Sequence, residues 1–272
     1  MNSDMPELPD RPDAPNFDGF LSLQFAKPFV LIDGTSRSLH FTQGELQSRM
    51  QLHSPWRLEV DYTRTMMGFL LFNPAPARIG MIGLGGGSIA KFCHRFLPAS
   101  HMTVLEINPY VLALRHEFQV PDDDARLLVI AGDGARYLHT EAPHYDVLLV
   151  DGFDQDGQPA ALCSQPFYDD CLAALPEGGL LVVNLHYEHP DYPVLVERIR
   201  RSFNGHAVEV MTQEHTNSIV FARKGQAIAP RDLNLRSSLA GLEVAARSEL
   251  RAELARMLWA MQSLDADTDE GA

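Results

Sequence analysis

The sequence has 272 residues, of which 45% are hydrophobic, and carries a formal net charge of -14 at pH 7. This length and apolar content suffice for a folded domain with a buried core, so they exclude a chain that is disordered throughout. Because 36 acidic residues stand against 22 basic ones, a general phosphate-binding surface is excluded, and we expect no nucleic-acid partner.

Targeting and redox features are inconspicuous. The segment from Met1 to Asp18 lacks the basic start and apolar run of a secretory signal, and no apolar stretch approaches the roughly 18 residues of a spanning helix. Cys93, Cys163 and Cys171 lack metal-ligand spacing, and an odd number of thiols is a poor disulfide framework. We therefore predict a cytoplasmic protein with no membrane contact, no bound metal and buried, unreactive thiols.

The N-terminal quarter indicates a tail and a small lobe. Residues 1–17 are rich in Pro and Asp and predict a flexible tail. Between residues 18 and 62, a turn signal at Asp33-Gly34 lies among short β-like segments, which predict a small antiparallel β lobe. These segments are Phe29–Ile32, Ser38–Phe41 and Arg57–Val60. An apolar run then predicts a helix over Thr63–Phe72, ended by Asn73-Pro74.

Residues 63–225 alternate between strand and helix patterns, which predicts an α/β domain of the Rossmann-like, nucleoside-binding type. The predicted parallel strands are Ile79–Leu84, Met102–Glu106, Leu127–Ala131, Tyr145–Asp151 and Leu180–Leu185. The predicted helices are Ser88–Phe96, Pro109–Phe118, Ala135–Glu141, Gln165–Ala174 and 190–203. Two further strands, Ala207–Thr212 and Ser218–Ala222, are expected to close a seven-stranded, mostly parallel sheet as a terminal antiparallel hairpin.

Residues 226–272 are predicted to form a C-terminal helical tail. Leu, Ala and Met recur at helical spacing between residues 231 and 264, which is typical of a helix that packs on a domain or on a second subunit.

The carboxyl ends of parallel strands meet at one edge, where α/β proteins bind ligands. The first strand runs into Gly83-Leu84-Gly85-Gly86-Gly87-Ser88, whose small residues let backbone amides approach a ligand at the start of a helix. Glu106 ends the second strand about 20 residues later, the position of a ribose-binding acid. The pattern predicts a nucleoside site that includes Gly83, Gly85, Gly86, Gly87 and Glu106.

Acidic residues also follow the third and fourth strands. Asp133, between Gly132 and Gly134, can reach an adenine amino group or cap the next helix. Asp151 and Asp154 lie three residues apart and can converge on one cation or share acid–base chemistry, because neighbouring like charges raise one pKa. A solvated acidic loop is the alternative.

These motifs resemble the spermidine synthase family, the polyamine aminopropyltransferases, which share the class I methyltransferase fold. The resemblance covers about residues 20–224 and is carried by Gly83–Ser88, Glu106-Ile107-Asn108, Gly132–Gly134, Asp151–Asp154 and Gln165–Tyr168. It implies that Glu106 binds the ribose, that Asp133 and Gly134 bind the adenine, and that Asp151 acts near the reacting amine. It also implies decarboxylated S-adenosylmethionine as co-substrate and a homodimer.

Two departures from the family pattern lie near the donor. The acid of the family's glycine loop, which binds the aminopropyl ammonium, falls at Gly86. The Tyr-Gln pair before the first strand of the sheet falls at Thr63-Arg64, with Tyr62 one residue away. A cation at Arg64 suits a carboxylate better than a polyamine. Tyr62 and Arg64 are therefore candidate substrate-binding residues.

A third departure concerns the acceptor side. Gln155 stands where the family has Pro after the second acid, and the fifth strand ends in Asn184-Leu185-His186 in place of the usual Gln. Asn184 is taken as a further substrate-binding candidate. His186 either lines the pocket or has a structural role.

The leading hypothesis is a spermidine synthase-like transferase that moves an aminopropyl group from decarboxylated S-adenosylmethionine to a small amine or other nucleophile. Asp151 is the predicted base, and Asp154 is the predicted contact for the substrate cation. Methyl transfer from S-adenosylmethionine is an alternative, since Arg64 suits its carboxylate. A third possibility is an NAD-dependent oxidoreductase, because its fingerprint is similar. The last is a non-catalytic nucleoside-binding homologue.

Overall fold

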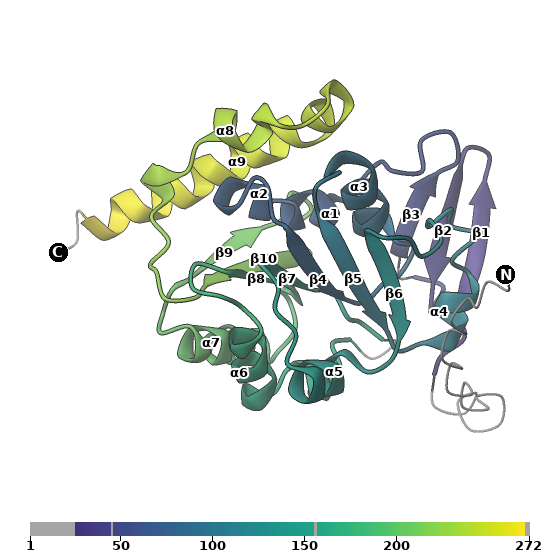
Figure 1. Ribbon diagram of the computed structural model, residues 1–272, viewed down its shortest axis with the longest axis horizontal. Coiled ribbons are helices and arrows are strands. Elements are labelled where there is room, and N and C mark those ends of the chain that lie inside the picture. Colours follow the sequence, from purple (N-terminus) through teal and green to yellow (C-terminus); the bar gives the residue numbers. More distant parts are fainter. Residues whose placement is uncertain (1–24, 45, 155–156, 270–272) are drawn as a thin grey trace, which may run out of the picture.

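The computed structural model describes residues 25–44, 46–154 and 157–269, with side-chain burial described as far as Ser263. The predicted tail at residues 1–17 and Gln155 lie outside the described residues. The described residues form two β-sheets, one of three strands and one of seven, with helices on both faces of the larger sheet (Figure 1).

The smaller sheet is antiparallel and has the order β1 (Phe29–Asp33), β2 (Ser36–His40) and β3 (Leu46–Gln51). It confirms the small N-terminal β lobe but not all its strands. The expected strand at Arg57–Val60 is wrong, because this segment instead packs against the C-terminal helix, where Leu58 N donates to Glu249 Oε1 at 3.2 Å. The real third strand, β3, escaped prediction because its alternating inward residues include the polar Ser48.

The larger sheet has the order β6-β5-β4-β7-β8-β10-β9. Its parallel strands are β4 (Arg78–Ile82), β5 (His101–Glu106), β6 (Leu127–Ala131), β7 (Val147–Val150) and β8 (Leu180–His186). The antiparallel pair β9 (Ala207–Met211) and β10 (Asn217–Arg223) completes it beside β8. This arrangement confirms the Rossmann-like fold with a terminal hairpin. Strand order reverses between β4 and β7, where such sheets bind ligands.

The faces of the larger sheet are set by alternation along each strand. On one face, Leu148, Val150 and Val183 pack beneath α5 (Gly134–Glu141), α6 (Gln165–Ala173) and α7 (Tyr192–Ser202). On the other, Leu149 and Val182 pack beneath α1 (Asp61–Met66), α2 (Phe69–Phe72) and α3 (Ser88–Phe96). Short 3-10 turns occupy Ala160–Leu162 and Pro230–Asp232.

Two predicted helices are shorter than expected. The helix predicted over Thr63–Phe72 is divided into α1 and α2, and the division falls at Gly68, where an added Cβ would lie 2.1 Å from Met257 Cε. The helix predicted from Pro109 to Phe118 ends as α4 (Pro109–Ala113), after which Leu114 and Arg115 donate to carbonyls three residues back. At Gly68 the close approach of Met257 explains the division, whereas α4 ends in tighter turns.

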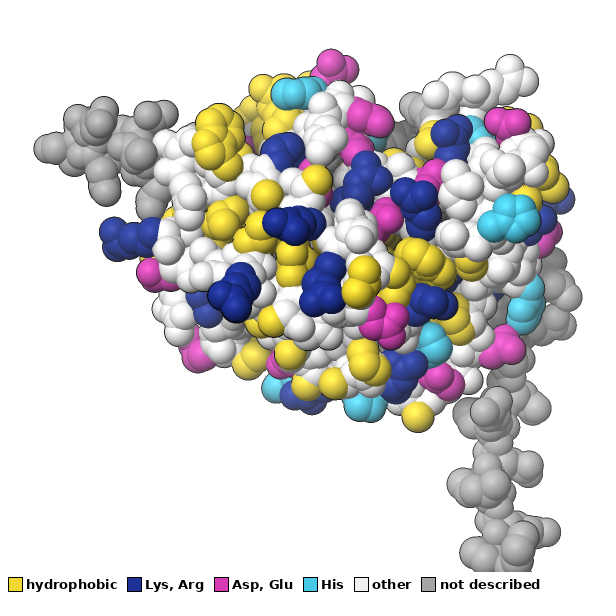
Figure 2. All heavy atoms as spheres, turned by 90° about the horizontal axis from the view of Figure 1, so that it is seen from above, with side chains coloured by type: hydrophobic (Ala, Val, Ile, Leu, Met, Phe, Trp, Pro, Cys, Tyr) yellow, Lys and Arg dark blue, Asp and Glu magenta, His cyan; other side chains and the backbone are white. Residues whose placement is uncertain are grey.

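The C-terminal segment forms α8 (Leu235–Ala240) and α9 (Val244–Asp269), which lie above α1 and α2 (Figure 1). The side chains of α9 that face the core are at most 1% exposed and are Ala246, Leu250, Leu254, Met257 and Met261. Seen from above, basic side chains gather over these two helices (Figure 2), where Arg236, Arg247 and Arg251 are exposed. The division of the chain at residues 18–62, 63–225 and 226–272 stays a prediction.

Candidate active site

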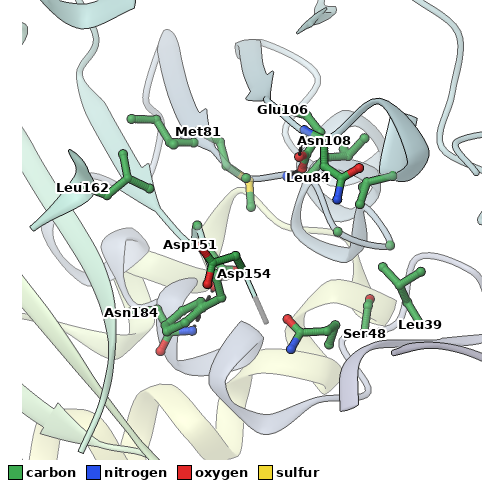
Figure 3. A pocket seen from close by; sticks show the side chains of 18 of the residues that line it. Leu39, Ser48, Met81, Leu84, Glu106, Asn108, Asp151, Asp154, Leu162 and Asn184 are labelled. Carbon is green, nitrogen blue, oxygen red and sulfur yellow. Dashed lines mark hydrogen bonds between the residues drawn. The ribbon is translucent and has the colours of Figure 1, made fainter. Parts of the chain in front are cut away.

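A cavity of about 500 Å³ lies at the carboxyl ends of β4, β5 and β7, between the larger sheet and the three-stranded sheet (Figure 3). This volume falls in the range of small-molecule sites. The candidate residues that line it are Tyr62, Gly83, Gly85, Gly86, Glu106, Asp133, Gly134, Asp151, Asp154 and Asn184. His186 also lines it, whereas Gly87 and Arg64 do not. The structure thus brings most of the predicted site together.

The glycine-rich turn between β4 and α3 has a backbone that requires glycine. Gly83, Gly85 and Gly87 have φ values of 94°, 51° and 66°, in the left-handed region that residues with a Cβ rarely adopt. At Gly83 an added Cβ would also lie 2.1 Å from the Asp151 carbonyl oxygen. The glycines therefore let the turn approach β7 and leave its amides at the edge of the cavity.

Gly86 is glycine for a different reason. Its φ is not positive, but an added Cβ would lie 2.4 Å from Ser48 Oγ and 2.9 Å from Phe118 Cδ1. Ser48 belongs to β3, so the three-stranded sheet occupies the space into which a side chain at position 86 would extend. An acid at this position, as expected from the family pattern, would require Ser48 and Phe118 to move.

Glu106 joins the glycine-rich turn to the end of β5. It is 7% exposed; its Oε2 accepts from Leu84 N and its Oε1 from Asn108 N, both at 2.8 Å. Burial raises the pKa of this carboxyl, and the backbone amide bonds oppose that effect. Because each carboxylate oxygen can accept a second bond, Glu106 can still bind a diol at the cavity wall.

Asp133 caps α5, one of the two roles anticipated for it. Its Oδ1 accepts from Ala135 N at 2.9 Å and from Arg136 N at 3.3 Å. The residue also lines the cavity beside Gly134. Its contact with an adenine stays a prediction.

Asp151 follows β7 and is held by two donors. Asn184 Nδ2 donates to its Oδ1 at 2.9 Å, and the Tyr62 hydroxyl donates to the same carboxylate. Burial raises the pKa of Asp151 to about 6, and the two hydrogen bonds oppose the rise. Asp151 is therefore mainly ionised at neutral pH yet binds a proton more readily than an ordinary carboxylate.

Asp154 lies on the same wall of the cavity as Asp151 and Asn184 (Figure 3). Its side chain is exposed, and its backbone N donates to Gly157 O at 2.8 Å. Close by, the rings of Phe153 and His186 pack with centroids 4.8 Å apart. An exposed acid at the mouth suits contact with a cationic ligand better than proton transfer in a dry site.

Arg64 does not line the cavity, so the substrate contact expected of this residue stays a prediction. Its guanidinium donates to Leu58 O and, at 3.5 Å, to Glu59 O. Residues two apart on a helix point in very different directions, and in α1 it is Tyr62 that reaches Asp151. The tyrosine that contacts Asp151 therefore precedes the position expected from the family pattern, and Thr63 follows it along the cavity wall.

Several cavity residues were not singled out from the sequence. Gln47 and Ser48 come from β3, while Asp61, 5% exposed, accepts from Glu214 N at 2.9 Å. Asn217, the first residue of β10, donates to Asn184 Oδ1 at 2.9 Å. Asn217 comes close to Asn184 through the pairing of β10 with β8, which no motif in the sequence indicates.

The three cysteines are free and buried, and burial raises the pKa of Cys93 to about 12. In the part of the chain that the structure describes, no cluster of three or more His, Cys, Asp or Glu side chains could hold a metal ion. No helix within the same residues has the length and apolar character needed to cross a membrane.

Solved structures with the same fold include a probable spermidine synthase from Corynebacterium glutamicum. It has a TM-score of 0.65 at 20% identity and covers 81% of this chain and 89% of its own. A spermidine synthase in complex with the transition-state analogue AdoDATO has a TM-score of 0.60 at 17% identity, covering 82% and 88%. Human methyltransferase-like protein 13, solved with SAH, has a TM-score of 0.59 at 22% identity, covering 72% and 93%. These similarities show a methyltransferase-type fold.

Sequence relatives narrow the assignment. A polyamine aminopropyltransferase from Neisseria meningitidis is 38% identical over 205 residues, which cover 75% of this chain and 77% of the relative. One from Chromobacterium violaceum is 38% identical over 191 residues, covering 70% and 73%. The family model of the spermine/spermidine synthase domain matches residues 59–212. With its methyltransferase-type fold and its cavity at the strand ends, this chain belongs to the spermine/spermidine synthase family.

Proposed function

We propose that this chain is an aminopropyltransferase that moves the aminopropyl group of decarboxylated S-adenosylmethionine to a small amine. The observation that carries the proposal is one cavity that holds both a nucleoside-type cradle and a carboxylate with a raised pKa, Asp151. The names of the sequence relatives support the same activity.

In this reaction the amine nitrogen attacks the aminopropyl carbon bonded to the sulfonium. A C–N bond forms while the C–S bond breaks, and the bonding pair goes to sulfur, so methylthioadenosine leaves as a neutral thioether. The nitrogen must have a free lone pair to attack, and one proton must be lost. Asp151 is suited to accept it because its pKa of about 6 leaves it ionised at neutral pH.

The other candidate residues divide between donor and acceptor. We assign the ribose to Glu106, the adenine to Asp133 and Gly134, and the sulfonium end to the glycine-rich turn with Gly83, Gly85 and Gly86. Gly87, which caps α3 away from the cavity, is assigned a backbone role. We propose that the acceptor amine binds beside Asp151, where Tyr62 and Asn184 contact it. Asp154 faces the positive charge of the acceptor. The alternative of methyl transfer relied on Arg64 to bind the carboxylate of S-adenosylmethionine, and Arg64 does not line the cavity.

We also propose a cytoplasmic homodimer that binds no nucleic acid. The net charge of -14 supports the lack of a nucleic-acid partner. The outer strand of the three-stranded sheet supports a dimer, because Leu31 and Ile32 are 52% and 64% exposed there.

The test is a transfer assay with labelled decarboxylated S-adenosylmethionine and putrescine. We expect Asp151→Asn to lower kcat by about 10²- to 10⁴-fold, since it removes the base and retains the shape. Asp122→Asn is the matched control, because Asp122 is an acid with an 84% exposed side chain that does not line the cavity. Unchanged turnover in Asp151→Asn would exclude the proposed base.

Donor choice is tested separately by calorimetry with decarboxylated S-adenosylmethionine, S-adenosylmethionine, methylthioadenosine and NAD. We expect the decarboxylated donor and methylthioadenosine to bind most tightly. Tight binding of NAD alone would contradict the transferase assignment. Methyl transfer from S-adenosylmethionine in the labelled-donor assay would instead identify the chain as a methyltransferase.

A further inference from the structure

Three polar side chains in the cavity wall form a chain of hydrogen bonds across neighbouring strands of the larger sheet. Asn217 Nδ2 donates to Asn184 Oδ1 at 2.9 Å, and Asn184 Nδ2 donates to Asp151 Oδ1 at 2.9 Å. Beyond these, the Thr216 hydroxyl donates to Asn217 Oδ1 at 2.9 Å. Asp151 is thus connected, through one amide, to a residue on the far side of β8.

The sheet register places these residues on one face. In the parallel pair β7 and β8, Val150 lies opposite Val183, so the next residues, Asp151 and Asn184, are neighbours. In the antiparallel pair β8 and β10, Asn217 lies opposite His186, two residues beyond Asn184 on the same face. The contacts therefore follow from backbone pairing and do not depend on a loop.

Burial gives the amide of Asn184 a fixed orientation. Asn184 is 1% exposed and Asn217 is 9% exposed, so water has little access to replace a missing partner. A primary amide can present either its NH₂ or its oxygen to a neighbour. Only the NH₂ can bond to an ionised carboxylate, and the Asn184 oxygen then needs a donor of its own, which Asn217 supplies.

We propose that Asn217 is a positioning residue for the transfer reaction, which fixes the Asn184 amide so that its NH₂ faces the ionised Asp151. This inference rests on the role of Asp151 given under the proposed function. Asn217 is a member of the cavity wall, but it acts on Asp151 through Asn184.

The effect on Asp151 has a definite direction. The bond from Asn184 lowers the pKa of Asp151 against the larger, opposing effect of burial. When the donor to Asn184 is lost, the amide is free to rotate and the bond to Asp151 weakens, so the pKa of Asp151 rises. The acid side of the kcat/KM profile should then move to higher pH.

Two substitutions of similar size separate positioning from packing. Asn217→Leu cannot donate a hydrogen bond at any pH. We expect its kcat to fall about tenfold and the acid limb of its kcat/KM profile to move to higher pH by about half a unit or more. Asn217→Asp can donate only while its carboxyl is protonated. At pH 9 it is ionised, so we expect at least a tenfold lower kcat/KM than the unsubstituted protein has at pH 9.

His215→Asp is the matched charge control. His215 lies in the same β9–β10 turn, is exposed and does not line the cavity, and its φ of 58° is one that Asp tolerates. It adds the same negative charge without a contact to Asn184. We expect its pH profile to match that of the unsubstituted protein.

Folding is checked by calorimetry with methylthioadenosine, whose dissociation constant should stay within about twofold in all three variants. The proposal is overturned if Asn217→Leu keeps the kcat and acid limb of the unsubstituted protein, or if Asn217→Asp is fully active at pH 9. Failure of the base assignment is separate, because it shows as activity in Asp151→Asn. Carbon-13 NMR of the Asp151 carboxyl reports its pKa in each variant even in that case.

Discussion

Gly86 and Ser48 pack closely together, because the hydroxyl of Ser48 lies 2.4 Å from the place that a Cβ on residue 86 would take. An acid at position 86, as expected from the family pattern, would therefore conflict with the close approach of β3. The glycine motif alone does not reveal this contact.

Gly86→Asp should consequently fail to restore a family-like donor contact. The added Cβ would meet Ser48 Oγ at 2.4 Å, so we expect a destabilisation of about 1–3 kcal/mol and weaker binding of decarboxylated S-adenosylmethionine by calorimetry. The double variant Ser48→Gly/Gly86→Asp should recover part of both losses. Tighter donor binding by Gly86→Asp alone would show that β3 moves aside readily.

Lys91 on α3 is a buried cation that the proposed reaction does not use. It is 4% exposed and donates to Phe118 O at 2.8 Å. Burial lowers the pKa of its ammonium to about 7, well below the value of an exposed lysine. The folded state therefore releases this proton at lower pH than the unfolded chain does.

Stability should then rise with pH above 7, because the unfolded chain still holds the proton there while the folded chain does not. The slope is about 1.4 kcal/mol per pH unit, from about pH 7 to about pH 10. Lys91→Met should remove this slope in urea unfolding at pH 7, 8 and 9. Lys27→Met, at an exposed position, should retain it, and equal slopes in all three proteins would contradict the account.

Among the helices and strands, α9 has the least expected connection to the site. Glu253 on α9 is 3% exposed and accepts from Thr65 Oγ1 at 2.6 Å and Gln213 Nε2 at 2.8 Å, and it pairs with Arg256 at 2.6 Å. Thr65 belongs to α1, which carries Tyr62, and Gln213 precedes Glu214 in the β9–β10 turn. One carboxylate thus fixes two segments that form a wall of the cavity.

Glu253→Leu should destabilise the fold by about 2–4 kcal/mol, since it leaves the partners of a buried carboxylate without an acceptor. Desolvation alone would raise the pKa of Glu253, but donation by Arg256, Thr65 and Gln213 lowers it overall. Its stabilising effect is therefore present at neutral pH and is lost as the pH falls below about 4.

Chemical unfolding at pH 7 and at pH 3 measures this difference. The difference in free energy of unfolding between the unsubstituted protein and Glu253→Leu should be smaller at pH 3 than at pH 7. Glu243→Leu, at an exposed position just before α9, is the control and should change stability by less than about 0.5 kcal/mol. A gap that is equal at both pH values would rule out a role for the charge.

Prediction from sequence succeeded for helices and strands whose own residues show a clear apolar pattern or a clear start. The strands β4 to β8 are nearly continuous apolar runs, and α3 and α6 begin at clear capping residues or small-residue turns, so their order and the residues at their ends were predictable. It failed for β3, whose inward Ser48 is polar, and for α1, where the tyrosine that contacts Asp151 is Tyr62, one residue before the position expected at Thr63. Contacts such as Asn217 with Asn184 depend on pairing between strands, which local patterns do not determine.

For the chain as a whole, charge and exposed apolar surface are unevenly distributed. The chain is acidic, but basic side chains gather over α8 and α9 (Figure 2), where Arg236, Arg247 and Arg251 are exposed. Exposed apolar residues occur both there, at Val244, and on the opposite lobe, at Leu31 and Ile32 of β1. Within the described residues no strand pairs with the outer edge of β1, and an open strand edge favours association between copies.

If the proposed dimer forms through this edge, Ile32→Lys should shift the protein to a monomer in light scattering coupled to size exclusion. Val244→Lys is the matched control, since Val244 is 69% exposed but lies on α9. It should leave the assembly unchanged. A monomer before any substitution would refute the dimer, and a dimer lost only in Val244→Lys would place the contact on α9.

The burial of α9 also bears on how the protein is made. The surfaces of α1 and β9 that α9 covers stay exposed until Leu250, Leu254 and Met257 have been synthesised, after every strand in the described part of the chain. During translation the nascent chain therefore exposes apolar surface until nearly the end, when chaperone binding and aggregation compete with folding. Ribosome stalling before residue 244 should yield a protease-sensitive species, and release past α9 should protect it.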